Sequence, residues 1–108
     1  MGSGILIRSR SRSAYVLWDD IYYIMKDLRR VFIFTKDDEY WEYGSMEQIG
    51  VLDDERFYQC HKSLIVNLDK LLCVTKDHIV MIDGNTVHMC RKYLQKTKKK
   101  WIDYHSKR

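Results

Sequence analysis

The chain contains no proline and only five glycines, so most of its turns must be formed by other residues. Its three cysteines, Cys60, Cys73 and Cys90, are an odd number without Cys-x-x-Cys spacing, which argues against a disulfide framework and a zinc site. They are expected to be small buried hydrophobic side chains or reduced thiols. No signal peptide is present, and no apolar run approaches the ~18 residues of a membrane span. These absences favour a cytoplasmic location without membrane contact.

The patterns that enzymes need are also missing. No glycine pair has the spacing of a phosphate-binding loop. Cys60 and His61 are adjacent, so on a strand they point to opposite faces and cannot form a thiolate–imidazole pair. The acidic clusters at 37–39 and 53–55 have no separate base or metal partner in view. We therefore expect no catalytic site, no metal site and no cofactor.

What the chain does contain suits one folded, mainly β domain. It has 108 residues, of which 45% are hydrophobic and 13% aromatic. Eight tyrosines, three tryptophans and three phenylalanines favour strands, where aromatic side chains pack well. Residues 1–4, Met-Gly-Ser-Gly, are typical of an added leader, which leaves room for a longer natural chain. Residues 5–108 are expected to form the single domain.

Charge is spread unevenly. Nineteen Lys and Arg against 15 Asp and Glu give a net charge of +4. Residues 91–108 hold eight bases and one acid, and the segment before Asp19 holds Arg8, Arg10 and Arg12 without an acid. Between Lys36 and Arg56 there are eight acids and two bases, those two included. Basic ends around an acidic middle predict one side that faces an anion, although a solvated tail beside an ordinary acidic face gives the same pattern.

The hydrophobic pattern predicts the order of elements. Short strands are expected at 5–9, 14–18, 21–25, 31–35, 40–43, 57–60, 71–75, 79–83 and 86–90. A short helix is expected at 46–51, capped by the Ser45 side chain, with a helical turn at 63–66. Tyr93, Leu94, Thr97 and Trp101 recur at helical spacing and predict a C-terminal helix over 91–105.

Basic and polar side chains gather at three predicted strand ends. The first group is the loop with Lys26, Arg29 and Arg30. The second is the His61-Lys62-Ser63 turn, and the third is the strand-to-helix junction at 91–92, with Lys96 one turn later. Loops at strand ends can share one edge of a sheet, so a common cationic surface is geometrically possible.

Residues 57–69 read Phe-Tyr-Gln-Cys-His-Lys-Ser-Leu-Ile-Val-Asn-Leu-Asp. This segment resembles the central Phe-x-x-x-His-[Arg/Lys/Asn]-Ser-x-x-Val-Asn-Leu-Asp phrase of the LytTR family of bacterial DNA-binding domains, and the resemblance extends from about residue 5 to about residue 100. It implies an elongated stack of small antiparallel sheets, about ten short strands with one short helix and a C-terminal helix. It also implies that loops on one side enter successive major grooves and bend the DNA.

The resemblance further implies roles for individual residues. The family's base-contacting positions fall on Arg30, Lys62 and Lys92. The first of these positions can be histidine and the second asparagine elsewhere in the family, so the cations here leave the preferred bases open. The neighbouring Lys26, Arg29, Ser63 and Arg91 are expected to contact phosphates, which set register and carry salt dependence.

Plainer readings of the same residues stay open. Arg29 and Arg30 are also compatible with a solvated hairpin tip. His61 either contacts a base or orients its turn through backbone hydrogen bonds. Asn67 is expected to bond the backbone and hold the chain bend. The lysines at 98–100 fit a solvated helix face.

The leading functional hypothesis is sequence-specific binding of double-stranded DNA by the output domain of a response regulator in a two-component system. A receiver domain would then lie upstream of Ile5, unless the natural protein is a short stand-alone or membrane-anchored regulator. Paired repeat sites, each occupied by one copy, are expected. The alternative is a small basic β module that binds acidic protein or RNA nonspecifically. Retention of specificity at physiological salt discriminates the two.

Overall fold

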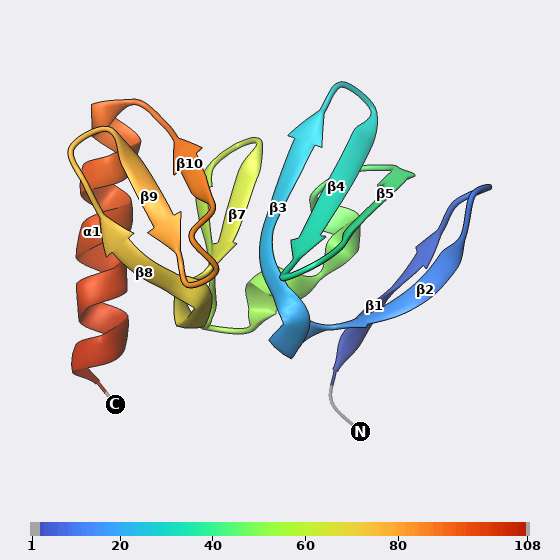
Figure 1. Cartoon of the computed structure of the whole chain (residues 1–108), viewed down its shortest axis with the longest axis horizontal. Helices are drawn as coiled ribbons and strands as arrows, with labels where there is room; N and C mark the ends of the chain where they lie inside the picture. The colour runs from blue at the N-terminus through green and yellow to red at the C-terminus, as the bar shows by residue number, and fades with distance from the viewer. Residues whose placement is uncertain (1–2, 108) are drawn as a thin grey trace.

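The computed structural model describes residues 3–107, and it is mainly β with one C-terminal helix (Figure 1). Ten strands form three antiparallel sheets, which confirms the expected fold class. The two-stranded sheet contains β1 (Gly4–Arg8) and β2 (Ser13–Leu17). The five-stranded sheet has the order β5-β4-β3-β7-β6, with bounds β3 Ile21–Asp27, β4 Arg30–Thr35, β5 Glu39–Tyr43, β6 Phe57–His61 and β7 Leu64–Asn67. The three-stranded sheet has the order β10-β9-β8, with bounds β8 Leu71–Val74, β9 His78–Met81 and β10 Thr86–His88.

Two hydrophobic clusters cover the two faces of the five-stranded sheet. In β4, Val31 and Ile33 point into the first cluster and are fully buried, as the alternation of a strand requires. The β1–β2 hairpin contributes Ile5 and Ile7 to the same cluster. Each such side chain contributes on the order of 1.5–3 kcal/mol when fully buried. The second cluster lies between β6–β7, the three-stranded sheet and helix α1 (Arg91–Ser106).

The prediction of a helical turn at 63–66 is wrong. Residues 64–67 form strand β7, an interior strand of the sheet between β3 and the edge strand β6. All four of its residues are buried, because the two clusters cover both faces. A continuous apolar run of this kind does not reveal by periodicity whether it is a strand or a helix.

The short helix expected at 46–51 is replaced by two 3-10 turns, Glu47–Ile49 and Val51–Asp53. Gly50 separates them with a φ of 77°, in the left-handed region that glycine enters without strain. The Ser45 side chain does not cap the first turn, but the Gln48 Oε1 accepts the Ser45 backbone N–H at 3.1 Å. Buried Ile49 and Val51 attach this segment to the first cluster.

Helix α1 confirms the predicted C-terminal helix. Leu94 and Thr97 are its buried residues, and Trp101 and Tyr104 pack against the second cluster. The Thr97 hydroxyl donates to the Tyr93 carbonyl oxygen at 2.8 Å, which satisfies it inside the helix. Of the leader expected at 1–4, residues 1–2 lie outside the described residues, and Gly4 belongs to β1, opposite Leu17.

The three cysteines are free, but only Cys60 is the buried hydrophobic residue that the sequence suggested, whereas Cys73 and Cys90 are exposed. Burial raises the pKa of the Cys60 thiol to about 11, so it stays protonated and unreactive at neutral pH. We expect two thiols of the native protein to react rapidly with an aromatic disulfide reagent and the third to react only in denaturant. Three rapidly reacting thiols in absorbance-monitored kinetics would contradict the packing of the second cluster.

Candidate nucleic-acid interface

Three polar turns lie along one edge of the molecule. The β3–β4 turn, the β6–β7 turn and the β10–α1 junction all occupy the upper edge in Figure 1. Strands β3 and β10 run toward this edge, whereas β4, β7 and α1 begin there. The alternation of strand directions therefore brings together the three chain segments whose sequence is rich in cations.

A backbone hydrogen bond joins the first two turns. The Lys26 N–H donates to the Ser63 carbonyl oxygen at 2.9 Å. This bond continues the antiparallel pairing of β3 with β7, in which Met25 is opposite Leu64. The β3–β4 and β6–β7 turns are thus neighbours, although they are more than 30 residues apart in the sequence.

Ring packing connects the second turn to the third. The His61 ring lies 5.2 Å from the Tyr93 ring in the first turn of α1. Helix α1 also packs along β6. Lys62 is therefore one residue away from a contact with the helical turn that carries Arg91 and Lys92. The turns that carry Arg30, Lys62 and Lys92 therefore lie along one edge, and contact of these residues with bases stays a prediction.

Arg30 is half-buried and held on aromatic rings. It is the first residue of β4 and points to the same face as Phe32, where its guanidinium lies 5.1 Å from the Phe32 ring centre and 5.5 Å from that of Trp41. Such cation–π contacts leave the guanidinium N–H groups free to donate in the plane. Asp27 is opposite Arg30 in the β3–β4 register. Sequence reasoning missed this aromatic support, because it depends on Trp41 lying across from Phe32 on β5.

Four of the other candidate side chains are more exposed than Arg30. Arg29, Lys62, Arg91 and Lys92 are exposed, and Lys26 and Ser63 are partly buried. No ion pair among residues 3–107 involves any of these cations or Arg30; the ion pairs present belong to Arg12, Arg56 and His78. Carboxylates do lie near two of these cations, since Asp27 is opposite Arg30, and the pKa of Glu47 is lowered first by a hydrogen bond from its own backbone and also by the charge of Lys26. Within the described part of the chain, however, none of the cations at this edge is in a direct ion pair.

The placement of Arg91 and Lys92 opposes the helix dipole. Both residues lie in the first turn of α1, which contains no acidic residue. Cations at a helix N-terminus are unfavourable, since the backbone N–H groups there already carry partial positive charge. The Lys92 Nζ lies 5.8 Å from the Tyr93 ring centre, but this contact does not offset the unfavourable position of two cations at the helix N-terminus. An external anion would satisfy both the side chains and the dipole.

His61 orients its own turn. Its Nδ1 accepts the Ser63 backbone N–H at 3.2 Å, which places the remaining ring proton on Nε2. Burial lowers the pKa of His61, so the ring is neutral at pH 7. The structure thus shows the backbone hydrogen bond by which His61 was expected to orient its turn. A contact with a base would have to use Nε2.

This arrangement predicts a pH dependence. The folded-state pKa of His61 lies below the ordinary value of 6.5, so the unfolded chain binds the proton more readily. The stability that neutral His61 contributes is present above that ordinary pKa and is lost as the pH falls through the folded value. We expect denaturant midpoints measured at about pH 7.5 and about pH 5 to differ less in His61→Gln than in the wild type. Equal differences in both proteins would assign the pH dependence to other groups.

Asn67 anchors the framework beneath the edge, as expected. It is fully buried at the end of β7. Its Nδ2 donates to the Ile21 carbonyl oxygen at 2.8 Å, and its Oδ1 accepts the Asp69 backbone N–H at 3.0 Å. The side chain therefore joins the start of β3 to the bend after β7. It fixes one strand that ends at the first turn and one that begins at the second.

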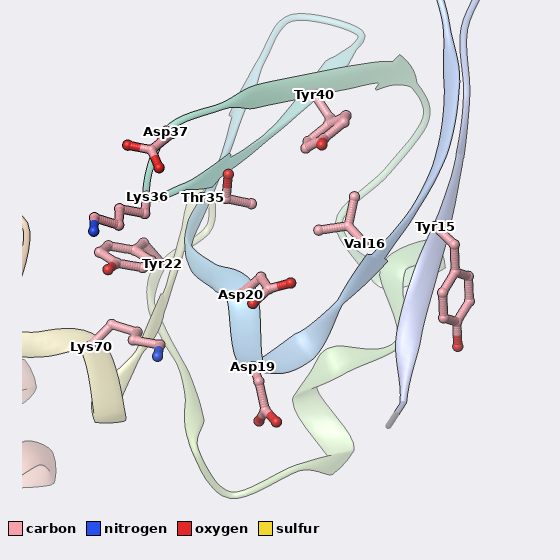
Figure 2. Close-up of a pocket in the computed structure, with 10 residues that line it drawn as sticks. All are labelled: Tyr15, Val16, Asp19, Asp20, Tyr22, Thr35, Lys36, Asp37, Tyr40 and Lys70. Atoms are coloured by element: carbon pink, nitrogen blue, oxygen red, sulfur yellow. The ribbon is translucent and has the colours of Figure 1, made fainter. Parts of the chain in front are cut away.

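The opposite edge has a different character. A pocket of about 450 Å³ lies there, and Asp19, Asp20 and Asp37 line it together with Lys36 and Lys70 (Figure 2). Asp19 also forms an ion pair with Arg56. Three acids thus gather at this edge beside two lysines, whereas Asp27 lies at the cationic edge, opposite Arg30. Among residues 3–107, no group of three or more His, Cys, Asp and Glu has a geometry that could hold a metal ion, and no helix is long and apolar enough to cross a membrane.

Three comparisons relate the chain to known proteins. The sequence profile of the LytTR family, described as "LytTr DNA-binding domain", matches residues 11–102. Accessory gene regulator A of Staphylococcus aureus is 28% identical over 98 residues, which cover 89% of this chain and 40% of the relative. Accessory gene regulator protein A of Staphylococcus epidermidis is 29% identical over 79 residues, which cover 70% of this chain and 33% of the relative.

A solved structure has the same fold. The LytTr DNA-binding domain of a Bacillus cereus protein described as a methyl-accepting/DNA response regulator aligns with a TM-score of 0.74 at 17% identity, covering 92% of this chain and 97% of that one. The chain spans two fifths or less of the length of these staphylococcal relatives. The profile match covers most of the chain, and the chain belongs to the LytTR family of DNA-binding domains.

Proposed function

We propose that this domain is the DNA-reading output module of a bacterial transcription regulator and that its three clustered turns bind one duplex in a sequence-specific manner. The observation that carries the proposal is the convergence of the β3–β4, β6–β7 and β10–α1 turns on one edge, joined by the Lys26–Ser63 hydrogen bond and the His61–Tyr93 contact. Their cations are without internal ion pairs among the described residues. Phosphates are the anions that such an edge can face over its whole length.

Arg30, Lys62 and Lys92 are the proposed base contacts. An arginine donates two parallel hydrogen bonds to guanine O6 and N7, and a lysine donates to the same acceptors. A good bidentate contact supplies on the order of 1–3 kcal/mol of discrimination. Lys26, Arg29, Ser63 and Arg91 surround these positions and are the proposed phosphate contacts, which hold the domain in register. His61 supports the second turn and keeps Nε2 for an acceptor.

The dimensions of the domain suit this mode of binding. Its long axis extends 38 Å, and one turn of B-DNA is about 34 Å. Turns spread along this axis can therefore meet more than one groove segment on the same face of a duplex. Loops that enter successive grooves favour a bent duplex, because bending brings more backbone into contact.

The natural protein is proposed to be longer and to bind paired sites. The staphylococcal relatives continue well beyond the matched region, since this chain covers only 33–40% of them. An upstream receiver domain would then control how two copies occupy neighbouring repeats. The domain itself would contribute the specificity of each half-site.

Selection of bound fragments from a random DNA pool tests the proposal directly. We expect one enriched sequence family and a large preference for it over bulk DNA at physiological salt. A generic polycation, including a module that prefers acidic protein or RNA, would enrich no sequence. Its affinities for any chosen site and for bulk DNA would fall in parallel as the salt concentration rises.

Replacing Lys92 with alanine separates a binding role from a folding role. We expect weaker DNA binding with an unchanged or slightly raised melting temperature, because the substitution removes a cation from the helix N-terminus. Lys99→Ala, on the exposed face of the same helix, is the matched control and should have the smaller effect on affinity. A large loss of thermal stability in Lys92→Ala would assign Lys92 to the fold instead.

A further inference from the structure

The β1–β2 hairpin presents basic groups that the three turns do not account for. Its tip carries Arg8-Ser9-Arg10-Ser11, and both arginines are exposed and take part in no ion pair among residues 3–107. The match to the family profile begins only at residue 11, so it does not include either arginine. The core of the domain needs only the apolar residues of this hairpin. The basic tip calls for a separate explanation.

The tip is held firmly against β5. Arg12 donates to both carboxylate oxygens of Asp38, at 3.1 and 2.6 Å, and to the Glu39 carbonyl oxygen at 2.8 Å. Its guanidinium also lies 4.1 Å from the Tyr40 ring centre. The Ser9 hydroxyl closes the turn by donating to the Arg12 carbonyl oxygen at 2.6 Å. Arg12 therefore serves to position the hairpin, while Arg8 and Arg10 stay available.

A groove of about 750 Å³ runs between the tip and β5, lined by Arg8, Ser9, Arg10, Ser11, Trp41 and Tyr43. Glu42 also lines it, but its Oε2 accepts the Arg8 backbone N–H at 3.2 Å. The groove adjoins the proposed interface, because Trp41 is one of the two rings beneath the Arg30 guanidinium. Tyr43 is opposite Arg30 in the strand register, and the next residue, Gly44, donates its N–H to the Arg29 carbonyl oxygen at 3.0 Å.

We propose that this hairpin groove is a fourth contact with the duplex, in which Arg8 and Arg10 bind backbone phosphates flanking the bases read by Arg30. The inference rests on the proposed function and extends it by one surface. In Figure 1 the hairpin tip rises toward the same upper edge as the three turns, at the end of the long axis opposite α1. Two guanidinium groups, the hydroxyls of three serines and two aromatic side chains line the groove and suit a sugar–phosphate chain. The contact lengthens the footprint without adding base specificity.

The test combines a protein change with a DNA change. Wild type and the Arg8→Ala/Arg10→Ala double variant are each titrated with two duplexes that contain the selected site. The long duplex keeps the flanking DNA next to the base pair read by Arg30, and the trimmed duplex lacks that flank. Wild type should lose affinity on trimming, whereas the variant should bind both duplexes equally, at about the wild-type level for the trimmed one. The slope of log affinity against log salt on the long duplex should fall by roughly two in the variant.

The control is the double variant Lys36→Ala/Lys107→Ala, which removes two positive charges at positions outside this edge. Its affinity for DNA should still fall when the duplex is trimmed. The inference is overturned if the double arginine variant binds both duplexes as the wild type does. That result would also be expected if the hairpin tip docks on another segment of a longer natural protein. If no sequence is enriched from the random DNA pool, the proposed function itself is contradicted. Unchanged melting temperatures verify that the exposed arginines are not structural.

A separate observation concerns Leu28 at the tip of the β3–β4 turn. Its φ is 58°, which makes it the one non-glycine residue among residues 3–107 with positive φ, and it is 84% exposed. Both features are unfavourable for a leucine, and strained backbone of this kind tends to occur at functional sites. The geometry points to Leu28 as an apolar contact for a thymine methyl group in the major groove, again resting on the proposed function.

Replacing single thymines of the selected site with deoxyuridine removes only the methyl group. One such replacement should weaken wild-type binding by about threefold to fivefold and leave Leu28→Ala unaffected. Equal sensitivity of both proteins at every thymine overturns the assignment. Leu28→Asn keeps a residue that tolerates positive φ and should behave like Leu28→Ala, which separates the apolar contact from turn geometry.

Discussion

Replacing Arg30 with alanine is expected to abolish discrimination at one base pair of the bound site while leaving affinity for bulk DNA nearly intact. The loss should amount to on the order of 1–3 kcal/mol, or roughly fivefold to 150-fold, at that position. The reason is geometric: the guanidinium rests on Phe32 and Trp41, so its plane is fixed before DNA arrives. A preorganised donor pair selects one base, whereas a freely rotating cation selects only charge.

Binding measured against all four bases at each position checks this expectation. Arg30→Lys keeps the charge but loses the paired donors, so it should retain bulk affinity and still lose discrimination. Arg29→Ala, in the same turn and exposed, is the matched control and should weaken binding uniformly. Uniform loss in Arg30→Ala would assign Arg30 to a phosphate.

Replacing Asn67 with alanine is expected to lower the free energy of unfolding by about 1–3 kcal/mol. The substitution removes a donor to the Ile21 carbonyl oxygen and an acceptor for the Asp69 N–H at a fully buried position. Buried backbone groups left without partners cannot turn to water, which is why the cost exceeds that of an exposed hydrogen bond.

Chemical denaturation monitored by tryptophan fluorescence measures the change. Lys62→Ala, an exposed substitution five residues earlier, should leave the midpoint unchanged. Asn67→Asp keeps the acceptor but loses the donor and buries a charge, so it should destabilise at least as strongly. An unchanged midpoint in Asn67→Ala would show that the bend after β7 does not depend on these two bonds.

Local signals predicted much of the fold. The β3–β4 hairpin follows from two aromatic and β-branched runs around a charged loop, and α1 follows from its apolar spacing. Strand β7 did not follow, because its four buried residues have no polar alternation to indicate a strand. Its interior position in the sheet depends on tertiary pairing with β3, which lies about 40 residues earlier in the sequence.

The site was predictable only in part for a similar reason. Cation-rich strand ends can be read along the chain, but their shared edge depends on strand order and direction. The aromatic support of Arg30 needs the register that places Trp41 opposite Phe32, and the hairpin groove needs β1 beside β5. Such contacts between distant segments leave no short-range pattern.

Titration of the isotopically labelled domain with its selected duplex, followed by backbone amide shifts in NMR spectra, tests the shared binding edge most directly. The largest shift changes should cluster at residues 26–30, 61–63 and 91–92, while amides of the acidic pocket around Asp20 and Asp37 stay unchanged. Changes confined to one of the three turns, or centred on the acidic pocket, would contradict it.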